Sequence, residues 1–109
     1  MELECDPVFA RVDKLLDLLN KSKSLHILYL LNLDNRPMRF SEIKKRVDSS
    51  STTVTRRLNE LEANGLVAKE LVPSSSTTIA YGLTETAQHL APTIQSMYDW
   101  IVKHKMYFV

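Results

Sequence analysis

Two segments with helical hydrophobic spacing are joined by only four polar residues, Asp48-Ser49-Ser50-Ser51, and this connection restricts the folds open to the chain. The first segment places Ile43 and Val47 on one side, and the longer second segment ends at Gly65. Aspartate and serine side chains compete for backbone hydrogen bonds and interrupt a helix, whereas glycine readily adopts the left-handed conformation that ends one. A helix-turn-helix unit is therefore predicted over about residues 41–64.

A β-hairpin is predicted directly after this unit. Residues 66–72 and 77–83 are rich in β-forming residues, and Pro73-Ser74-Ser75-Ser76 supplies turn residues between them. A hairpin in this position is a wing, here at about residues 66–83. The order of elements thus predicts a winged helix-turn-helix fold.

Further helices are predicted before the helix-turn-helix unit. Asp6 and the proline after it favour a helix over about residues 7–20. Residues 25–33 are apolar nearly all round, which is typical of a buried central helix. Ser24 is expected to cap this central helix, and Ser41 is expected to cap the first helix of the helix-turn-helix unit.

The C-terminal part is predicted to form a last helix over about residues 84–105, capped by Thr84. Pro92 lies inside this segment and is expected to kink or split the helix, because proline lacks the backbone N–H. Met38-Arg39-Phe40 is expected to be a short extended piece. The chain is thus predicted to be a single α+β domain, mainly α, that spans residues 1–109 and has a two-stranded wing.

Positive charge is concentrated in residues 36–57. This stretch carries seven basic and two acidic side chains, whereas the parts before and after it each have a net charge of −2. A run of charges is usually a solvated surface, but this one coincides with the predicted helix-turn-helix unit. Arg36, Arg39, Lys44 and Lys45 are expected where such a unit crosses the sugar-phosphate backbone, with a positioning role.

The second helix of the unit is expected to turn a polar face outward. If Val54, Leu58 and Leu61 pack against the core, Arg56 and Asn59 lie on the opposite face beside small hydroxyls. Arginine can pair with guanine and asparagine with adenine, and a helix N-terminus attracts phosphate. We therefore expect this helix to read bases. The residues expected to contact DNA are Arg36, Arg39, Ser41, Lys44, Lys45, Ser50, Ser51, Thr52, Thr53, Thr55, Arg56, Arg57, Asn59, Ser75 and Thr78.

Several spaced stretches resemble the HxlR-type branch of the winged-helix regulators, which is related to the MarR group. They are Cys5 with Pro7-Val8, FSEIKKRV at 40–47, TRRLNELEANGLV at 55–67, YGLTETA at 81–87, Pro92 and Trp100. The resemblance covers nearly the whole chain. It implies a dimeric repressor or activator of transcription that binds double-stranded DNA, with residues 51–64 in the major groove.

The chain departs from the family pattern at several points. Asn20-Lys21-Ser22-Lys23 stands where the family tends to have Gly-Gly-Lys-Trp, and Asp6 separates Cys5 from Pro7. The wing has Thr78 where the family commonly has arginine, and its tip is uncharged. Contacts between the wing and the minor groove are therefore expected to add little electrostatic affinity.

The first and last helices form the dimer interface that the resemblance implies. The first helix carries apolar residues on two sides, and the end of the chain is too apolar to face water on a small monomer. A two-fold partner would cover both patches and place two reading helices on an inverted repeat. The residues expected at the interface of this homodimer are Val8, Phe9, Val12, Leu16, Leu19, Ile94, Tyr98, Trp100, Ile101 and Phe108.

Cys5 is the one cysteine and lies beside the N-terminus of the first helix, a position that favours a thiolate. In some members of the family the N-terminal cysteine senses oxidants or electrophiles. Here Glu2, Glu4 and Asp6 surround Cys5 and oppose a thiolate, so we expect it to be dispensable for DNA binding. A redox-sensing thiol is the alternative.

Other classes of function are not expected. No cysteine and histidine have metal-ligand spacing, there is no glycine-rich phosphate loop, and no serine has a base and an orienting acid. An enzyme, a cofactor and a metal site are therefore not expected, and no residues identify a small-molecule effector. The longest apolar run, residues 25–33, is too short to span a bilayer, so a cytoplasmic protein is expected. The rival interpretation is a winged-helix protein-interaction module within a transcription assembly.

Overall fold

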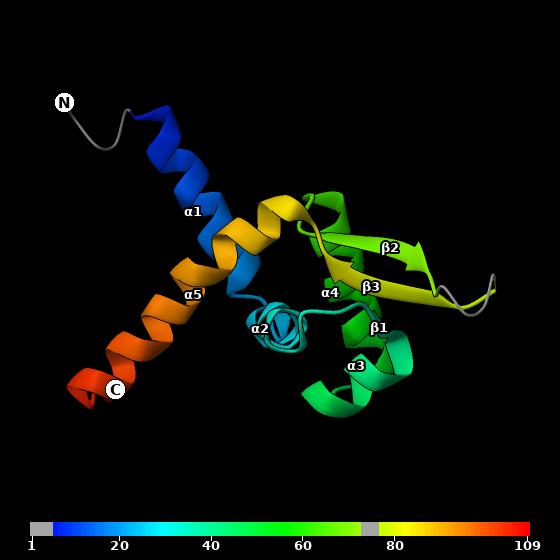
Figure 1. Cartoon of the computed structure of the whole chain (residues 1–109). Helices are drawn as coiled ribbons and strands as arrows, with labels where there is room; N and C mark the ends of the chain where they lie inside the picture. The colour runs from blue at the N-terminus through cyan, green and yellow to red at the C-terminus, as the bar shows by residue number, and fades with distance from the viewer. Residues whose placement is uncertain (1–5, 73–76) are drawn as a thin grey trace.

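Helix α2 lies at the centre of the fold, and most other elements pack on it. The computed structural model describes residues 6–72 and 77–109. In chain order the elements are α1 (Pro7–Leu19), α2 (Ser24–Asp34), β1 (Met38–Arg39), α3 (Phe40–Val47), α4 (Ser51–Ala63), β2 (Val67–Leu71), β3 (Ile79–Leu83) and α5 (Glu85–His104) (Figure 1). Helix α2 contacts α1, α3, α4, α5 and strand β3.

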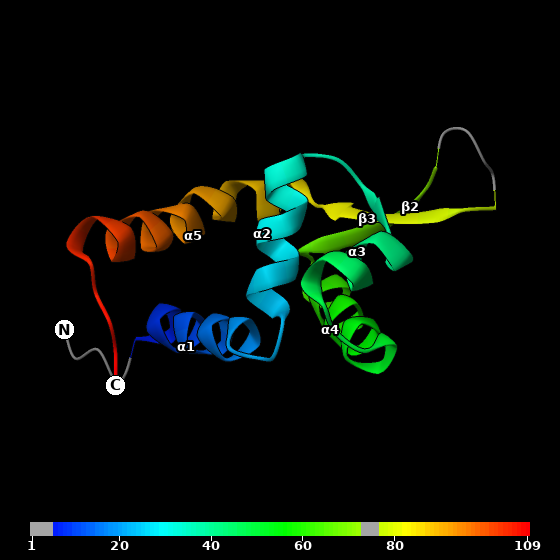
Figure 2. The same cartoon turned by 90° about the horizontal axis from the view of Figure 1, so that it is seen from below.

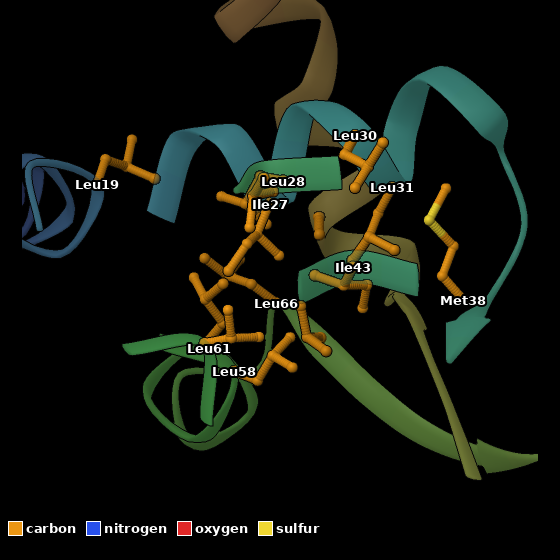
Figure 3. Packing of buried hydrophobic residues seen from close by; sticks show 14 residues of the cluster. Leu19, Ile27, Leu28, Leu30, Leu31, Met38, Ile43, Leu58, Leu61 and Leu66 are labelled. Carbon is orange, nitrogen blue, oxygen red and sulfur yellow. The ribbon is translucent and has the colours of Figure 1, made fainter. Parts of the chain in front are cut away.

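The hydrophobic core surrounds α2. Ile27, Leu28 and Leu31 are each no more than 4% exposed. Figure 3 shows them among buried side chains that include Ile43 of α3 and Leu58 of α4. Burial of a side chain of this size contributes about 1.5–3 kcal/mol. The predicted central helix is therefore confirmed, and it holds both helices of the helix-turn-helix unit.

The predicted wing is formed by β2 and β3, and it gains a third strand. The sheet order is β1-β3-β2 with antiparallel neighbours. The short extended piece before α3 is β1, which places Met38 opposite Tyr81 of β3. Because Met38 is fully buried, β1 ties the start of α3 to the base of the wing.

Asp6 and Thr84 cap their helices as predicted. A carboxylate oxygen of Asp6 accepts a hydrogen bond from the backbone N–H of Val8 at 2.8 Å. The hydroxyl of Thr84 accepts one from Ala87 at 3.2 Å and donates one to the carbonyl of Gly65 at 2.7 Å. Thr84 therefore both starts α5 and joins it to the end of α4.

The caps predicted at Ser24 and Ser41 are wrong. Ser24 is the first residue of α2 and is fully buried, and Lys23, at φ 71°, precedes it in a tight turn. Ser41 is the second residue of α3, because β1 leads directly into the helix at Phe40. Arg39 takes the extended cap position there and provides no side-chain cap.

Helices α3 and α4 form the predicted helix-turn-helix unit. The turn between them begins at Asp48, which has a left-handed backbone at φ 51°. The hydroxyl of Ser50 accepts a hydrogen bond from the backbone N–H of Thr53 at 3.2 Å and so caps α4. Gly65, at φ 75°, follows the C-cap of α4, in a conformation that a side chain would disfavour. The polar turn thus determines where α4 begins.

Helix α5 runs unbroken through Pro92, so the predicted splitting of this helix is wrong. Ala87 and Ala91 are buried on one side of the helix, and Leu90 and Ile94 pack on the core. These contacts hold the turns before and after Pro92 in one helix. Pro92 itself is exposed, where its ring meets solvent.

Helices α1 and α5 extend from the core on the side away from the wing (Figure 2). The start of α1 and the end of α5 lie at the same end of the molecule. The body of the fold therefore separates two surfaces: the helix-turn-helix unit with its wing, and the pair of helices formed by α1 and α5.

Replacing Ile43 by alanine is expected to lower the free energy of unfolding by about 2–5 kcal/mol, because its side chain is fully buried between elements that pack on α2. Urea titration measures the change. Ile79→Ala is the matched control: Ile79 is 48% exposed on the wing, and a change below about 1 kcal/mol is expected. Equal losses for the two variants would contradict this assignment of the core.

Candidate nucleic-acid interface

Helix α4 presents a polar face to solvent because its apolar residues are drawn into the core. Val54, Leu58 and Leu61 are at most 1% exposed and set the rotation of the helix about its axis. Arg56 and Asn59 are exposed on the other side, as predicted. A shallow polar hollow follows this outer face, and its lining residues are Ser51, Thr52, Thr55, Arg56, Asn59 and Glu60. We call these six residues the α4 hollow.

The hydroxyl-bearing residues at the start of α4 divide into two groups. Ser50 and Thr53 are engaged with each other, since the hydroxyl of Ser50 lies 3.1 Å from that of Thr53 and accepts its backbone N–H. Ser51 and Thr52 are exposed in the first turn. Ser50 and Thr53 thus hold the start of α4, and the DNA contacts predicted at these four residues stay predictions.

Arg57 does not lie on the outer face of α4, and the predicted contact between Arg57 and DNA is therefore corrected. It is 8% exposed, and its Nη2 lies 3.3 Å from a carboxylate oxygen of Glu60. Residue 57 precedes Leu58 and lies one turn before Leu61, so it shares the inward side of α4. Arg57 is therefore a structural residue of the helix.

Positive side chains also lie at both ends of α3, with Arg39 at its N-cap and Lys44 and Lys45 in its last turn. Arg39 and Lys45 are exposed, and both line a hollow between α3 and the sheet together with Ser41. Lys44 is half-buried. Within the described residues, Arg39, Lys44 and Lys45 form no ion pair. Their charges are thus available to an anionic ligand.

Arg36 belongs instead to an ion-pair network that sequence analysis did not predict. Its Nη1 and Nη2 lie 3.3 and 2.6 Å from the two carboxylate oxygens of Glu42, and Nη2 lies 3.3 Å from Asp34. Nη1 of Arg46 lies 2.6 Å from the same oxygen of Asp34. Two carboxylates therefore compensate two arginines, and the geometry does not favour Arg36 as a phosphate contact.

The ion pair between Arg36 and Glu42 also favours the charged forms of these two side chains. Hydrogen bonds from Arg36 lower the pKa of the Glu42 carboxyl. The same hydrogen bonds, with the negative charge of Glu42, raise the pKa of Arg36. Glu42 therefore stays ionised at neutral pH. Asp34 ends α2 and Glu42 belongs to α3. The turn between these helices brings both carboxylates to Arg36.

Ser75 and Thr78 of the wing are also predicted to contact DNA. Thr78 is half-buried and already takes part in an interaction within the protein, and Ser75 lies outside the described residues. Lys69 of β2 lies 3.8 Å from Glu62 of α4, which joins the wing to the end of that helix. Cys5 also lies outside the described residues, so its predicted role stays a prediction.

Helix α1 carries the exposed apolar side predicted for a dimer. Val8, Phe9, Val12 and Leu16 are 41–57% exposed. Leu19 is a correction: it is 6% exposed and belongs to the core of its own chain, because the turn after α1 brings it onto α2. Four of the five residues predicted on this helix thus form one uncovered face.

The C-terminal half of α5 also remains uncovered. Tyr98, Trp100 and Ile101 are 37–55% exposed, and Phe108 after the helix is 72% exposed. Ile94 is half-buried and packs on the core of its own chain, so only part of its surface is open to a partner.

An apolar cleft of about 510 Å³ lies between α2 and α5, and sequence analysis did not predict it. Its lining residues are Leu25, His26, Tyr29, Ile94, Met97, Tyr98 and Ile101. Tyr29 and Tyr98 stack there with ring centroids 6.0 Å apart. The helical spacing of Leu25 and Tyr29 was a usable signal, but it could not indicate which element would lie opposite.

Within the described residues, no cluster of three or more histidine, cysteine, aspartate or glutamate side chains could hold a metal ion. No helix in that part of the chain is long and apolar enough to cross a membrane.

Residues 20–107 match the family described as HxlR-like helix-turn-helix. The chain is 33% identical over 91 residues to the HTH-type transcriptional regulator BH0655 of Halalkalibacterium halodurans. The aligned stretch covers 83% of this chain and 80% of that protein. The reduced form of the transcriptional regulator YodB from B. subtilis is similar in structure, with a TM-score of 0.74 and 29% identity over 84% of this chain and 88% of that one. The S. aureus MepR-DNA complex shares the fold, with a TM-score of 0.69 and 19% identity over 88% and 79% of the two chains.

Replacing Arg57 by alanine is expected to lower stability, because the substitution removes a buried side chain and the partner of Glu60. The expected loss in the free energy of unfolding is about 1–3 kcal/mol, measured by urea titration. Arg56→Ala is the control on the exposed face and is expected to stay within about 0.5 kcal/mol of wild type. A stable Arg57→Ala protein with weakened DNA binding would restore the original assignment of Arg57 to the DNA contacts.

Proposed function

Since the chain belongs to the HxlR-like helix-turn-helix family, whose members are DNA-binding regulators of transcription, we propose that it binds a specific operator as a homodimer and is not an enzyme. The single observation that carries this proposal is the α4 hollow. It joins an exposed arginine and an exposed asparagine with hydroxyl groups on the second helix of a helix-turn-helix unit.

The residues of the α4 hollow have the chemistry needed to distinguish base pairs in the major groove. Arg56 can donate two hydrogen bonds to guanine, and Asn59 can both donate to and accept from adenine. Ser51 and Thr52 lie in the first turn of α4, where backbone N–H groups and the helix dipole favour a phosphate. Arg39 and Lys45, beside Ser41, would contact the sugar-phosphate backbone and position the helix.

The uncovered apolar faces of α1 and α5 support the proposal of a homodimer. Exposed apolar surface on this scale, spread over two neighbouring helices, is unusual on a small monomer. A two-fold axis would let the same surface on each protomer cover its counterpart. The two α4 helices would then meet successive major grooves, which favours an inverted repeat with half-sites about 10 base pairs, or a multiple, apart.

Arg56→Ala is expected to weaken binding to the selected operator by about 1–3 kcal/mol per half-site and to relax sequence preference, because a base contact is lost. Lys45→Ala is the matched phosphate variant and should weaken operator and random DNA alike, with a slope of log affinity against log salt smaller by about 1 per protomer. Fluorescence anisotropy on both duplexes measures the difference. If Arg56→Ala lost the same affinity for both duplexes, base reading by Arg56 would be refuted. A wild-type protein with no salt-dependent DNA binding would instead favour the rival interpretation, a winged-helix protein-interaction module.

Val12→Glu is expected to shift the protein from dimer to monomer at micromolar concentration, because a charge would enter the apolar face of α1. Sedimentation velocity measures the oligomeric state. Thr86→Glu places the same charge on the exposed first turn of α5, near the core, and should leave the dimer intact. A wild-type protein that sediments as a monomer and binds one half-site as tightly as the repeat would contradict the dimer.

A further inference from the structure

An ion-pair network joins Arg36, Glu42 and Arg46, which belong to the positively charged residues 36–57, to Asp34, which lies just before them. We propose that Glu42 and Asp34 withhold Arg36 and Arg46 from DNA phosphates and so set an upper limit on the electrostatic affinity for DNA. This inference rests on the proposed function, because it concerns the strength and salt dependence of the same interaction.

The two carboxylates are positioned to bind Arg36 and Arg46. Glu42 uses both carboxylate oxygens on the two terminal nitrogens of Arg36, at 3.3 and 2.6 Å, in the paired arrangement that suits guanidinium best. Asp34 bridges Arg36 and Arg46, at 3.3 and 2.6 Å. The side chains of these two acids are 23–35% exposed, and those of the two arginines 38–50%. Both arginines are thus near the surface but already hold anionic partners there.

The network divides the basic residues of the segment into two groups. Arg36, Arg46 and Arg57 are each paired with a carboxylate. Among the described residues, Arg39, Lys44, Lys45 and Arg56 form no ion pair. The unpaired cations are Arg39 at the N-cap of α3, Lys44 and Lys45 in its last turn, and Arg56 in the α4 hollow. Arg36 and Glu42 line the same hollow as Arg39 and Lys45, so the network compensates positive charge directly beside the proposed phosphate contacts.

The number of uncompensated cations has a direct thermodynamic consequence. Each phosphate that a protein neutralises releases counterions and adds about −0.9 to the slope of log affinity against log salt. One extra cation per protomer would therefore raise the affinity at 0.1 M salt on the order of tenfold per protomer. This term does not depend on sequence, so it acts on random DNA and on an operator alike.

Glu42→Gln tests the inference by removing one of the two carboxylates while keeping a side chain of the same shape. The affinity of the full chain for a random-sequence duplex is measured by anisotropy across a series of KCl concentrations. The variant is expected to bind on the order of tenfold more tightly per protomer at 0.1 M salt, with a slope steeper by about 0.9 per protomer. Asp34→Asn is a second variant with the same expectation. Exposed ion pairs contribute little to stability, so both variants are expected to unfold close to the wild-type temperature.

Two controls make the result specific. Glu85→Gln has the same change in net charge but lies in the first turn of α5, outside the helix-turn-helix unit, and its slope is expected to match wild type. The double variant Arg36→Gln with Glu42→Gln removes one charge of each sign and is also expected to match wild type. A loss of slope in the double variant would overturn the inference, because it would mean that Arg36 itself contacts phosphate.

The inference also fails if Glu42→Gln and Asp34→Asn bind with the wild-type slope, or if Glu85→Gln strengthens binding as much as they do. These results leave the proposed function standing, since the wild-type protein would still bind DNA. If the wild-type protein itself shows no salt-dependent binding to the duplex, the proposed function fails first, and the inference fails with it.

Discussion

The burial of helix α2 is the interaction on which the rest of the structure depends. Its apolar side chains point in several directions, so water can be excluded from them only if other elements approach from several sides. Helices α3 and α4, strand β3, α1 and α5 all make this approach. The relative positions of the helix-turn-helix unit and the two terminal helices are therefore consequences of one packing requirement.

The orientation of α4 shows how this packing produces a binding surface. Val54, Leu58 and Leu61 are held against the core, and a helix whose inward side is anchored in this way has a determined outward side. Arg56 and Asn59 are on that side. The Ser50 cap at one end and the left-handed Gly65 at the other keep the helix at a length that ends where the wing begins. The polar hollow is thus built by the apolar contacts behind it.

The positive charge of residues 36–57 is distributed less evenly than the net charge of this segment implies. Arg36 and Arg46 are tied to carboxylates between the end of α2 and α3, and Arg57 to Glu60 on α4. Paired arginines hold neighbouring elements together, whereas Arg39, Lys45 and Arg56, which form no ion pair with a described residue, lie on the proposed DNA-facing surface. A protein that must bind one site among many gains from this arrangement, because each phosphate contact strengthens binding to all sequences alike.

The sequence by itself determined the order and type of the elements, because hydrophobic spacing, the polar turn at residues 48–51 and the glycine after α4 act over short distances along the chain. It also determined the outward face of α4, since helical periodicity relates Arg56 and Asn59 to the buried leucines. Only the tertiary structure decided that Leu19 joins the core and that Asp34 and Glu42 share Arg36. It likewise decided that α5 continues through Pro92 and that β1 adds a strand to the wing. Each of these outcomes depends on which segment lies opposite a residue in space, and local periodicity carries no information about that partner.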